Sequence, residues 1–380
     1  MSDVAIELIY RGIFQKTLAQ RICRGIVLAT RRAGKVGIAF SRYSDSPERN
    51  GIPAKQFAVV ADDPEQLQAT MAKYQPSETD VTIVLDDTLC KGIESWAWDG
   101  LHPVNELLKP DGVLLVVSGR QPGDLVKEVH RRAAPYNLAV LRGEASFSGM
   151  WVFKDDHSDV RVLGALATVC PQLLGLPTVE ESVLEQYRDP ARVESARGGA
   201  QEVVVRRVEA GEGNPEQPFK FRLPPLAEME IALVVRGAPA GKGFRAGQAG
   251  FEPGRNPHYR KYSTRSMRPV TDFDACTKCG QCWLLCPDSA LDTTPEGYYD
   301  VSLASCCGCG VCEESCPAKA ITMVSEAAFS DNASQYLLWR RDRGAYRALT
   351  RKAAAGARPR SHGLHHWKQY QEEARAKGGA

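Results

Sequence analysis

The sequence lacks the patterns that mark membrane-spanning or secreted proteins. It has no run of about 18 apolar residues, which excludes an ordinary membrane-spanning helix. Its first ten residues, MSDVAIELIY, lack the basic region and long apolar run of a secretory signal. A net charge of +2 identifies no class of partner, and 43% hydrophobic and 25% charged residues are typical of a soluble globular protein. At 380 residues, the chain is long enough for two domains.

Cysteine, in contrast, is concentrated in one stretch of the chain. Cys276 to Pro287 follows the spacing C-x2-C-x2-C-x3-C-P, and Cys306 to Pro317 repeats it. This is the bacterial iron–sulfur spacing, in which the fourth cysteine of each run binds the cluster of the other run. The sequence therefore predicts two [4Fe-4S] clusters. We assign one cluster to Cys276, Cys279, Cys282 and Cys316, and the other to Cys286, Cys306, Cys309 and Cys312.

Disulfide bonds and zinc sites fit these cysteines less well. Disulfides need an oxidising compartment, and zinc ribbons do not use a doubled x2-x2-x3 run that ends in proline. Cys307 beside Cys306 is expected to be a small packed residue. Cys23, Cys90 and Cys170 fit free thiols in the reducing cytoplasm.

Residues 1–190 alternate strand-like and helical patterns. Strands are predicted at 5–10, 36–41, 57–61, 81–87, 113–118 and 138–141, and helices at 17–32, 64–74 and 124–134. The nearly continuous apolar strand 81–87 is typical of a strand buried on both faces of a parallel sheet. This predicts an α/β fold, a Rossmann-like parallel sheet with helices on both faces.

Loops that follow parallel strands gather at one sheet edge, where ligands usually bind. The three candidates here are residues 11–17, 42–53 and 86–92, and none contains G-x-G-x-x-G or a P-loop. The second contains Glu48, Arg49 and Asn50. These three are either an ordinary solvated loop or a group that faces a ligand.

The rest of the chain divides into three parts. Residues 191–265 are rich in Gly, Pro, Arg and Glu and predict an extended linker, and residues 266–328 predict an α+β ferredoxin-like domain. Residues 329–380 predict a basic helical tail; residues 326–380 hold eleven Lys or Arg and five Asp or Glu. The tail's charge also fits a membrane surface or nucleic acid. We expect neither, and predict helices packed on partner subunits through Trp339, Tyr346 and Trp367.

Two parts of the chain resemble subunits of the 2-oxoacid:ferredoxin oxidoreductases, which include pyruvate:ferredoxin oxidoreductase. Residues 1–190 resemble the gamma subunit through IELIYRG (6–12), the helix after it and YSDSPERNGIPAKQFAVV (43–60). Residues 259–325 resemble the delta subunit through residues 259–291 and 307–321, which contain both cysteine runs. The resemblance implies a fused gamma–delta subunit.

Trp283 lies between Cys282 and Cys286 in the sequence. It either shields a cluster from water or simply packs against neighbouring side chains.

One position departs from this family. Gamma subunits usually carry a G-R-G-G-Q-G-type loop after the first strand, and residues 11–16 here read RGIFQK. A similar loss characterises oxalate oxidoreductase, a relative that does not use coenzyme A. Pro47-Glu48-Arg49-x-Gly51 nevertheless keeps the gamma pattern. Coenzyme A use is therefore open.

The resemblance implies a multi-subunit enzyme. It also implies that thiamine diphosphate and Mg²⁺ are bound by alpha and beta subunits. The absence of a Gly-Asp-Gly followed by Asn-Asn in this chain is consistent with that. This chain would cap the active site with Glu48, Arg49 and Asn50, and would pass electrons to an external ferredoxin. Coenzyme A is a possible co-substrate. The alternatives are an iron–sulfur subunit of another redox complex, such as a hydrogenase or bifurcating dehydrogenase, an oxalate oxidoreductase-type subunit, or an assembly scaffold with no residue near the substrate.

Overall fold

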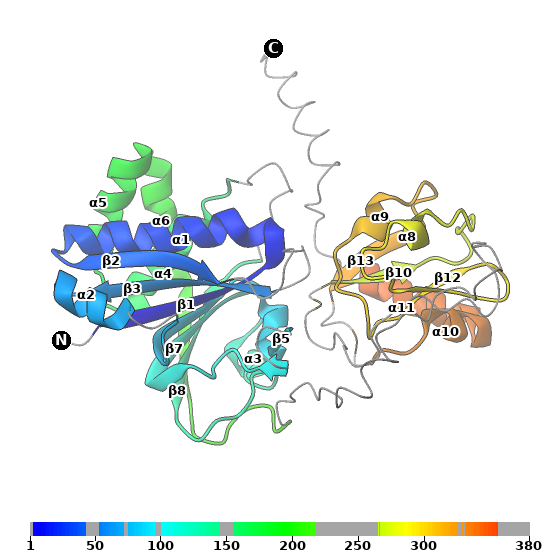
Figure 1. Cartoon of the computed structure of the whole chain (residues 1–380), viewed down its shortest axis with the longest axis horizontal. Coiled ribbons are helices and arrows are strands. Elements are labelled where there is room, and N and C mark those ends of the chain that lie inside the picture. Colours follow the sequence, from blue (N-terminus) through cyan, green and yellow to red (C-terminus); the bar gives the residue numbers. More distant parts are fainter. Residues whose placement is uncertain are drawn as a thin grey trace, which may run out of the picture. The chain divides into compact units, whose positions relative to one another are not determined.

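The computed structural model describes most of the chain: residues 3–42, 53–71, 75–95, 100–144, 155–216, 265, 267–325, 329 and 331–355. These residues fall into two compact units. One contains a seven-stranded sheet and its helices, and the other contains the elements from residue 267 onward (Figure 1). The candidate residues Glu48, Arg49 and Asn50 lie outside the described residues, as do Trp367 and residues 217–264 of the predicted linker.

The first unit is built on a mixed sheet in the order β2-β3-β1-β4-β7-β8-β9. The strands are β1 (Val4–Arg11), β2 (Val36–Arg42), β3 (Pro53–Ala61), β4 (Thr79–Val84), β7 (Leu108–Ser118), β8 (Tyr136–Arg142) and β9 (Val203–Val208). The four central strands β1, β4, β7 and β8 are parallel, as predicted. The prediction of a wholly parallel sheet is wrong at both edges, because β3 pairs antiparallel with β1 and β2, and β9 pairs antiparallel with β8.

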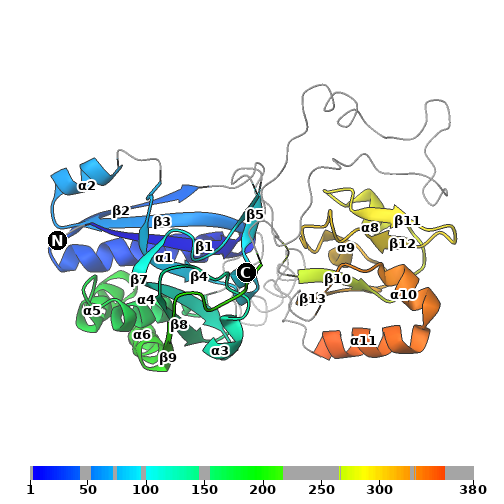
Figure 2. The ribbon, with the colours of Figure 1, turned by 90° about the horizontal axis from the view of Figure 1, so that it is seen from below.

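Four helices pack together on one face of this sheet (Figure 1). They are α1 (Gly12–Arg32), α4 (Ser158–Val169), α5 (Leu176–Tyr187) and α6 (Pro190–Glu202). Alternate side chains of β1 point toward them and join a core that includes residues of all four helices. The short helix α2 (Pro64–Met71) lies on the other side of β2 and β3 from α1 (Figure 2).

The remaining elements of this unit are short. They are η1 (Asp87–Lys91) and α3 (Pro122–Leu125). The strands β5 (Ile93–Ser95) and β6 (Gly100–His102) pair with each other, and Glu94–Gly100 is grouped with the second unit. The predicted helix 124–134 is wrong beyond Leu125. There the backbone leaves the helix, and the Val129 carbonyl and Arg131 amide bond to Asn214 at 2.8 and 2.9 Å. A distant segment therefore supplies the partners that a local helix would have provided.

Two domain boundaries need correction. The predicted linker began at residue 191, but α6 and β9 belong to the sheet and its helical layer. The predicted tail began at residue 329, but α10 (Gln335–Arg341) and α11 (Arg343–Ala355) pack in the second unit. They are two separate helices, because Asp342 between them is extended and its carboxylate accepts a hydrogen bond from the Ala345 amide at 2.9 Å.

The tail helices are held by aromatic side chains. Phe273 packs against Tyr336, Trp339 and Tyr346 with ring centroids 5.4–6.0 Å apart. The Tyr346 hydroxyl donates to the Thr271 carbonyl at 2.9 Å. The expectation that Trp339 and Tyr346 anchor the tail to partner subunits is therefore wrong, because both are buried within this unit.

The second unit also contains two antiparallel strand pairs and two single-turn helices. They are β10 (Met267–Thr271), α8 (Gln281–Leu284), β11 (Leu291–Thr293), β12 (Tyr299–Val301), α9 (Val311–Glu314) and β13 (Ile321–Ser325). β10 pairs with β13, and β11 pairs with β12. Among the described residues of both units, none of the helices combines the length and the apolar character that a membrane span requires.

Candidate metal centre

The two cysteine runs have the same backbone conformation, offset by 30 residues. Gly280 and Gly310 have φ of 78° and 84°, and Ser289 and Lys319 have φ of 49° and 51°. Left-handed conformations are costly for residues other than glycine, so their repetition at matching positions indicates that both runs form the same loop.

Strand pairing explains how the fourth cysteine of each run reaches the other run. The segment that follows Cys286 becomes β11, and β11 pairs with β12, which leads into the loop from Cys306. The segment that follows Cys316 becomes β13, and β13 pairs with β10, which leads into the loop from Cys276. Each strand pair thus joins the end of one run to the start of the other.

The structure brings together the second predicted set of thiols. One pocket is lined by Cys286, Cys306, Cys309 and Cys312, and also by Cys307. Burial raises the pKa of the Cys306 thiol to about 12, and the nearby Cys307 and Cys286 thiols add to the rise. Burial also raises the pKa of Cys312 well above its ordinary value, with Cys306 and Cys286 contributing.

The first set is gathered in the same way. Burial raises the pKa of the Cys282 thiol to about 12, and Cys276, Cys279 and Cys316 raise it further. Cys316, forty residues from Cys276 in sequence, also raises the pKa of Cys276, after burial as the main cause. Cys316 therefore lies close enough to Cys276 and Cys282 for its charge to affect their pKa values.

Backbone amides point at several of these sulfurs. Ala290 and Ala320 donate to Cys286 and Cys316 Sγ at 3.2 Å each, again 30 residues apart. Gly308 donates to Cys306 Sγ at 3.3 Å. A Cβ at Gly308 would lie 2.2 Å from the Met267 carbonyl oxygen, so only glycine fits there. Such N–H···S bonds stabilise a thiolate and tune a bound cluster.

Apolar side chains surround the thiols. Leu291, Tyr299, Val301 and Leu303 form a small buried core, and Trp283 packs against it beside Cys282. Thiols with raised pKa values are protonated at neutral pH, and a bound metal ion replaces their protons. No three His, Cys, Asp or Glu of the described ranges are arranged as ligands of a single metal ion. Cysteine thiols that accept hydrogen bonds from backbone amides are the kind of ligand that a 4Fe-4S centre uses.

One edge of the sheet in the first unit brings together charged residues from two of the loops that the sequence predicted to meet there. Arg11 and Asp86 follow neighbouring strands, are almost fully buried and form an ion pair at 3.9 Å. The Arg11 amide donates to Gln15 Oε1 at 2.8 Å, which anchors the start of α1. The predicted loop 11–17 is thus the first turn of α1, and the helix begins five residues earlier than expected.

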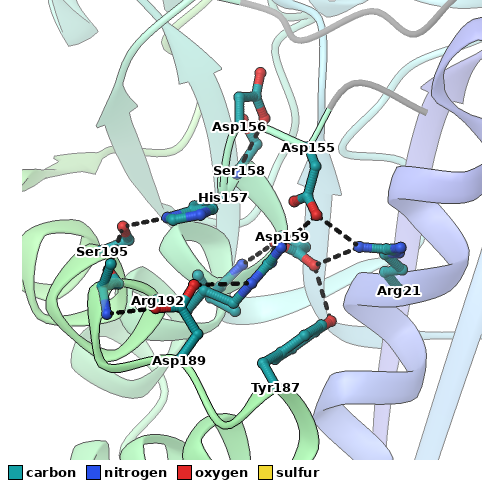
Figure 3. Close-up of polar contacts among 12 residues, drawn as sticks. Arg21, Asp155, Asp156, His157, Ser158, Asp159, Tyr187, Asp189, Arg192 and Ser195 are labelled. Carbon is teal, nitrogen blue, oxygen red and sulfur yellow. Dashed lines mark hydrogen bonds and ion pairs between the residues drawn. The ribbon is translucent and has the colours of Figure 1, made fainter. Parts of the chain in front are cut away.

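A polar network joins the helices α1, α4, α5 and α6 that pack on one face of the sheet (Figure 3). Asp159, 2% exposed, accepts from the Tyr187 hydroxyl at 3.0 Å and pairs with Arg192 at 3.6 Å and Arg21 at 3.9 Å. His157 Nδ1 lies 2.9 Å from Ser195 Oγ. That hydroxyl donates to its own helix at the Ala191 carbonyl, 2.9 Å away, so the pair is structural rather than nucleophilic.

Known proteins match the cysteine region. A family model described as a 4Fe-4S binding domain matches residues 269–292. Pyruvate synthase subunit PorD of Methanocaldococcus jannaschii is 34% identical over 76 residues, which is 88% of that protein and 20% of this chain. The chain belongs to the 2-oxoacid:ferredoxin oxidoreductase family. Its class is therefore that of oxidoreductase subunits that bind 4Fe-4S centres and transfer electrons.

Two further relatives of this oxidoreductase family match shorter parts. Ketoisovalerate oxidoreductase subunit VorD of Pyrococcus furiosus is 45% identical over 62 residues, 59% of that protein and 16% of this chain. The delta subunit of NADH-dependent phenylglyoxylate dehydrogenase from Aromatoleum evansii is 46% identical over 42 residues, 44% of that protein and 11% of this chain. The chain thus spans about half the length of these two relatives.

Two solved structures also resemble the chain. Pyruvate oxidoreductase subunit PORC of Thermotoga maritima is 21% identical with a TM-score of 0.38, and covers 54% of this chain and 99% of its own. The gamma subunit of a keto/oxoacid ferredoxin oxidoreductase from Geobacter sulfurreducens is 19% identical with a TM-score of 0.33. The match covers 53% of this chain and 94% of that subunit. Likenesses this distant support no assignment for the first unit.

Proposed function

We propose that this chain is the fused gamma–delta subunit of a thiamine diphosphate-dependent 2-oxoacid:ferredoxin oxidoreductase. Its second unit would hold two [4Fe-4S] clusters on the crossed cysteine sets. Its first unit would cap an active site formed by alpha and beta subunits, which bind thiamine diphosphate and Mg²⁺. The crossing of Cys286 and Cys316 through the strand pairs is the observation that best supports this function.

The clusters, when bound, supply one-electron carriers. Oxidative decarboxylation of a 2-oxoacid releases carbon dioxide and two electrons, so a donor of two electrons must be matched to carriers of one. Two clusters could each accept one of the two electrons. The electrons would then pass to ferredoxin or a similar acceptor. The acyl group would go to coenzyme A, or leave as carbon dioxide in an oxalate-type enzyme.

The chain's own residues have defined parts in this proposal. The eight cysteines bind iron, the amides of Ala290, Ala320 and Gly308 stabilise sulfur charge, and the apolar core with Trp283 limits water. Arg49 is the candidate for pairing with a carboxylate or phosphate, and Glu48 and Asn50 flank it. The names of the relatives suggest pyruvate, ketoisovalerate and phenylglyoxylate as first substrates to test.

Purification of the native complex tests the proposal. We expect chains with a thiamine diphosphate motif, iron and sulfide for two clusters, and reduction of ferredoxin or a viologen dye by one of these 2-oxoacids. Assays with and without coenzyme A separate the acyl-transferring enzyme from an oxalate type. Co-purification with a flavin or nickel–iron chain, and no 2-oxoacid activity, would instead support the alternative of another redox complex.

A further inference from the structure

Arg265 is a fully buried cation beside the second cysteine loop. Its Nη1 donates to the carbonyl oxygens of Leu303 and Cys306, the latter at 3.3 Å. Its Nη2 donates to Asn332 Oδ1 at 2.8 Å, an oxygen that also accepts from Arg268. The guanidinium is therefore fixed against the backbone that carries a cluster ligand.

The first cysteine loop has a different charge beside it. Lys278 is exposed; its Nζ donates to the Glu296 carbonyl at 2.8 Å and lies 4.2 Å from the Tyr298 ring centroid. Water and salt screen an exposed charge, whereas a buried charge acts through a lower dielectric constant. Of the two cations, Arg265 therefore exerts the stronger field on the centre beside it.

A buried anion partly opposes this field. Glu313 follows Cys312, is 4% exposed and accepts a hydrogen bond from the Met323 amide at 2.7 Å. Its counterpart 30 residues earlier is Trp283, which is uncharged. The two cysteine runs thus share a backbone conformation but differ in the buried charges beside them. Only the second centre has a buried guanidinium and a buried carboxylate beside it among the described residues.

We propose that Arg265 raises the reduction potential of the centre held by Cys286, Cys306, Cys309 and Cys312, so that this centre is reduced more readily. The inference depends on the proposed function to the extent that both cysteine sets bind [4Fe-4S] clusters. Uptake of one electron makes a cluster one unit more negative, and the electron would come from 2-oxoacid oxidation. The fixed positive charge of Arg265 stabilises that added negative charge and remains protonated throughout.

A redox titration of the purified complex, followed by the electron paramagnetic resonance of the reduced clusters, tests this inference. In Arg265→Met, we expect one of the two one-electron steps to move to more negative potential. At a fixed potential near that step, the reduced-to-oxidised ratio should fall about tenfold, which corresponds to about 59 mV. Arg265→Lys keeps the charge and should restore most of the shift.

A second variant covers the case in which Arg265→Met fails to assemble. Asn332→Asp leaves Arg265 in place and puts a negative charge beside it at an exposed position, so the same step should move in the same direction. Arg351→Met removes an exposed charge on α11 and should move neither step. Glu313→Gln should move the step of the second centre to more positive potential.

The outcomes separate the two proposals. Suppose that the wild-type complex contains iron and sulfide for two clusters while Arg265→Met and Asn332→Asp move neither step. In that case the proposed role of Arg265 is wrong, and the proposed function is not contradicted. Equal shifts in Arg265→Met and Arg265→Lys would also overturn it, because they would reflect packing rather than charge. If the wild-type protein binds no clusters, the proposed function itself fails.

Discussion

Gly199 of α6 lies directly against the backbone of Arg161 in α4. A Cβ added at Gly199 would lie 2.0 Å from the Arg161 carbonyl oxygen. Gly164 of α4 makes the matching contact with α6, since a Cβ added there would lie 1.8 Å from the Ala196 carbonyl oxygen. The two helices therefore touch backbone to backbone, and this contact brings α6 into the helical layer that the predicted linker boundary excluded.

Gly199→Ala is expected to destabilise the first unit by more than about 2 kcal/mol. The added methyl group meets backbone atoms, which cannot move aside as a side chain can, so the helices must separate. Urea denaturation measures the change. Hydrogen exchange should show the loss of protection in α4 and α6 first.

The adjacent Gly198 provides a matched control. A Cβ there would meet only Glu202 Oε1, at 3.9 Å, so Gly198→Ala should stabilise the helix by about 0.5–1 kcal/mol. If the two neighbouring substitutions changed the free energy of unfolding by the same amount, the close contact of α4 with α6 would be contradicted.

Removal of iron is expected to unfold the second unit. Its described hydrophobic clusters are small, and one of them packs directly on the cluster cysteines. So small a unit depends on its metal for stability. Chelation should abolish the near-ultraviolet circular dichroism of the aromatic cluster around Phe273, while hydrogen exchange in β4 and β7 stays unchanged. An intact aromatic signal after complete loss of iron would contradict this dependence.

The cysteine spacing is a local signal, and the two ligand sets stay a prediction drawn from it. Spacing within each run fixes which three thiols share a loop, and the fourth follows from where the chain goes next. The central strands were also predictable, since buried parallel strands are continuously apolar. Edge pairing was not, because strand direction at β3 and β9 depends on connections rather than on composition.

Contacts between distant segments account for the remaining differences between prediction and structure. Sequence reasoning assigned Trp339 to a contact with a partner subunit, because no local feature shows that it packs on Phe273 of the same unit. The bonds of Asn214 to residues 129–131 likewise replaced a plausible helix. The burial of Arg265 was not predicted, because nothing in the sequence distinguishes it from the other arginines of a Gly- and Arg-rich stretch.

Substitution of Arg49 tests the proposed capping role of the first unit. If Arg49 pairs with a carboxylate or phosphate of substrate or coenzyme A, Arg49→Ala should lower kcat/KM by about tenfold or more. Arg49→Lys should recover only part of this, because it cannot form a bidentate pair. Arg24→Ala on the exposed side of α1 is the control and should leave turnover unchanged. Unchanged kinetics in Arg49→Ala would favour an assembly scaffold.

His130 is expected to make the stability of the first unit depend on pH. Its side chain is 3% exposed, and in the described structure neither ring nitrogen has a hydrogen-bond partner. Burial lowers the pKa of His130 below its ordinary value of 6.5, although Glu216 acts weakly in the opposite direction. The folded protein therefore holds a neutral imidazole at pH values where the unfolded chain is already protonated.

The sign of the pH effect follows from proton binding. Between the lowered pKa of the folded state and about 6.5, the unfolded chain binds more protons at this position than the folded chain, so stability rises with pH. The contribution of His130 is complete above about pH 6.5 and is lost as pH falls toward its folded-state pKa. Urea denaturation between about pH 5 and 7 should show a steeper loss of stability in wild type than in His130→Leu. Parallel curves for the two proteins would mean that His130 binds protons equally in the folded and unfolded states, which would contradict the lowered pKa.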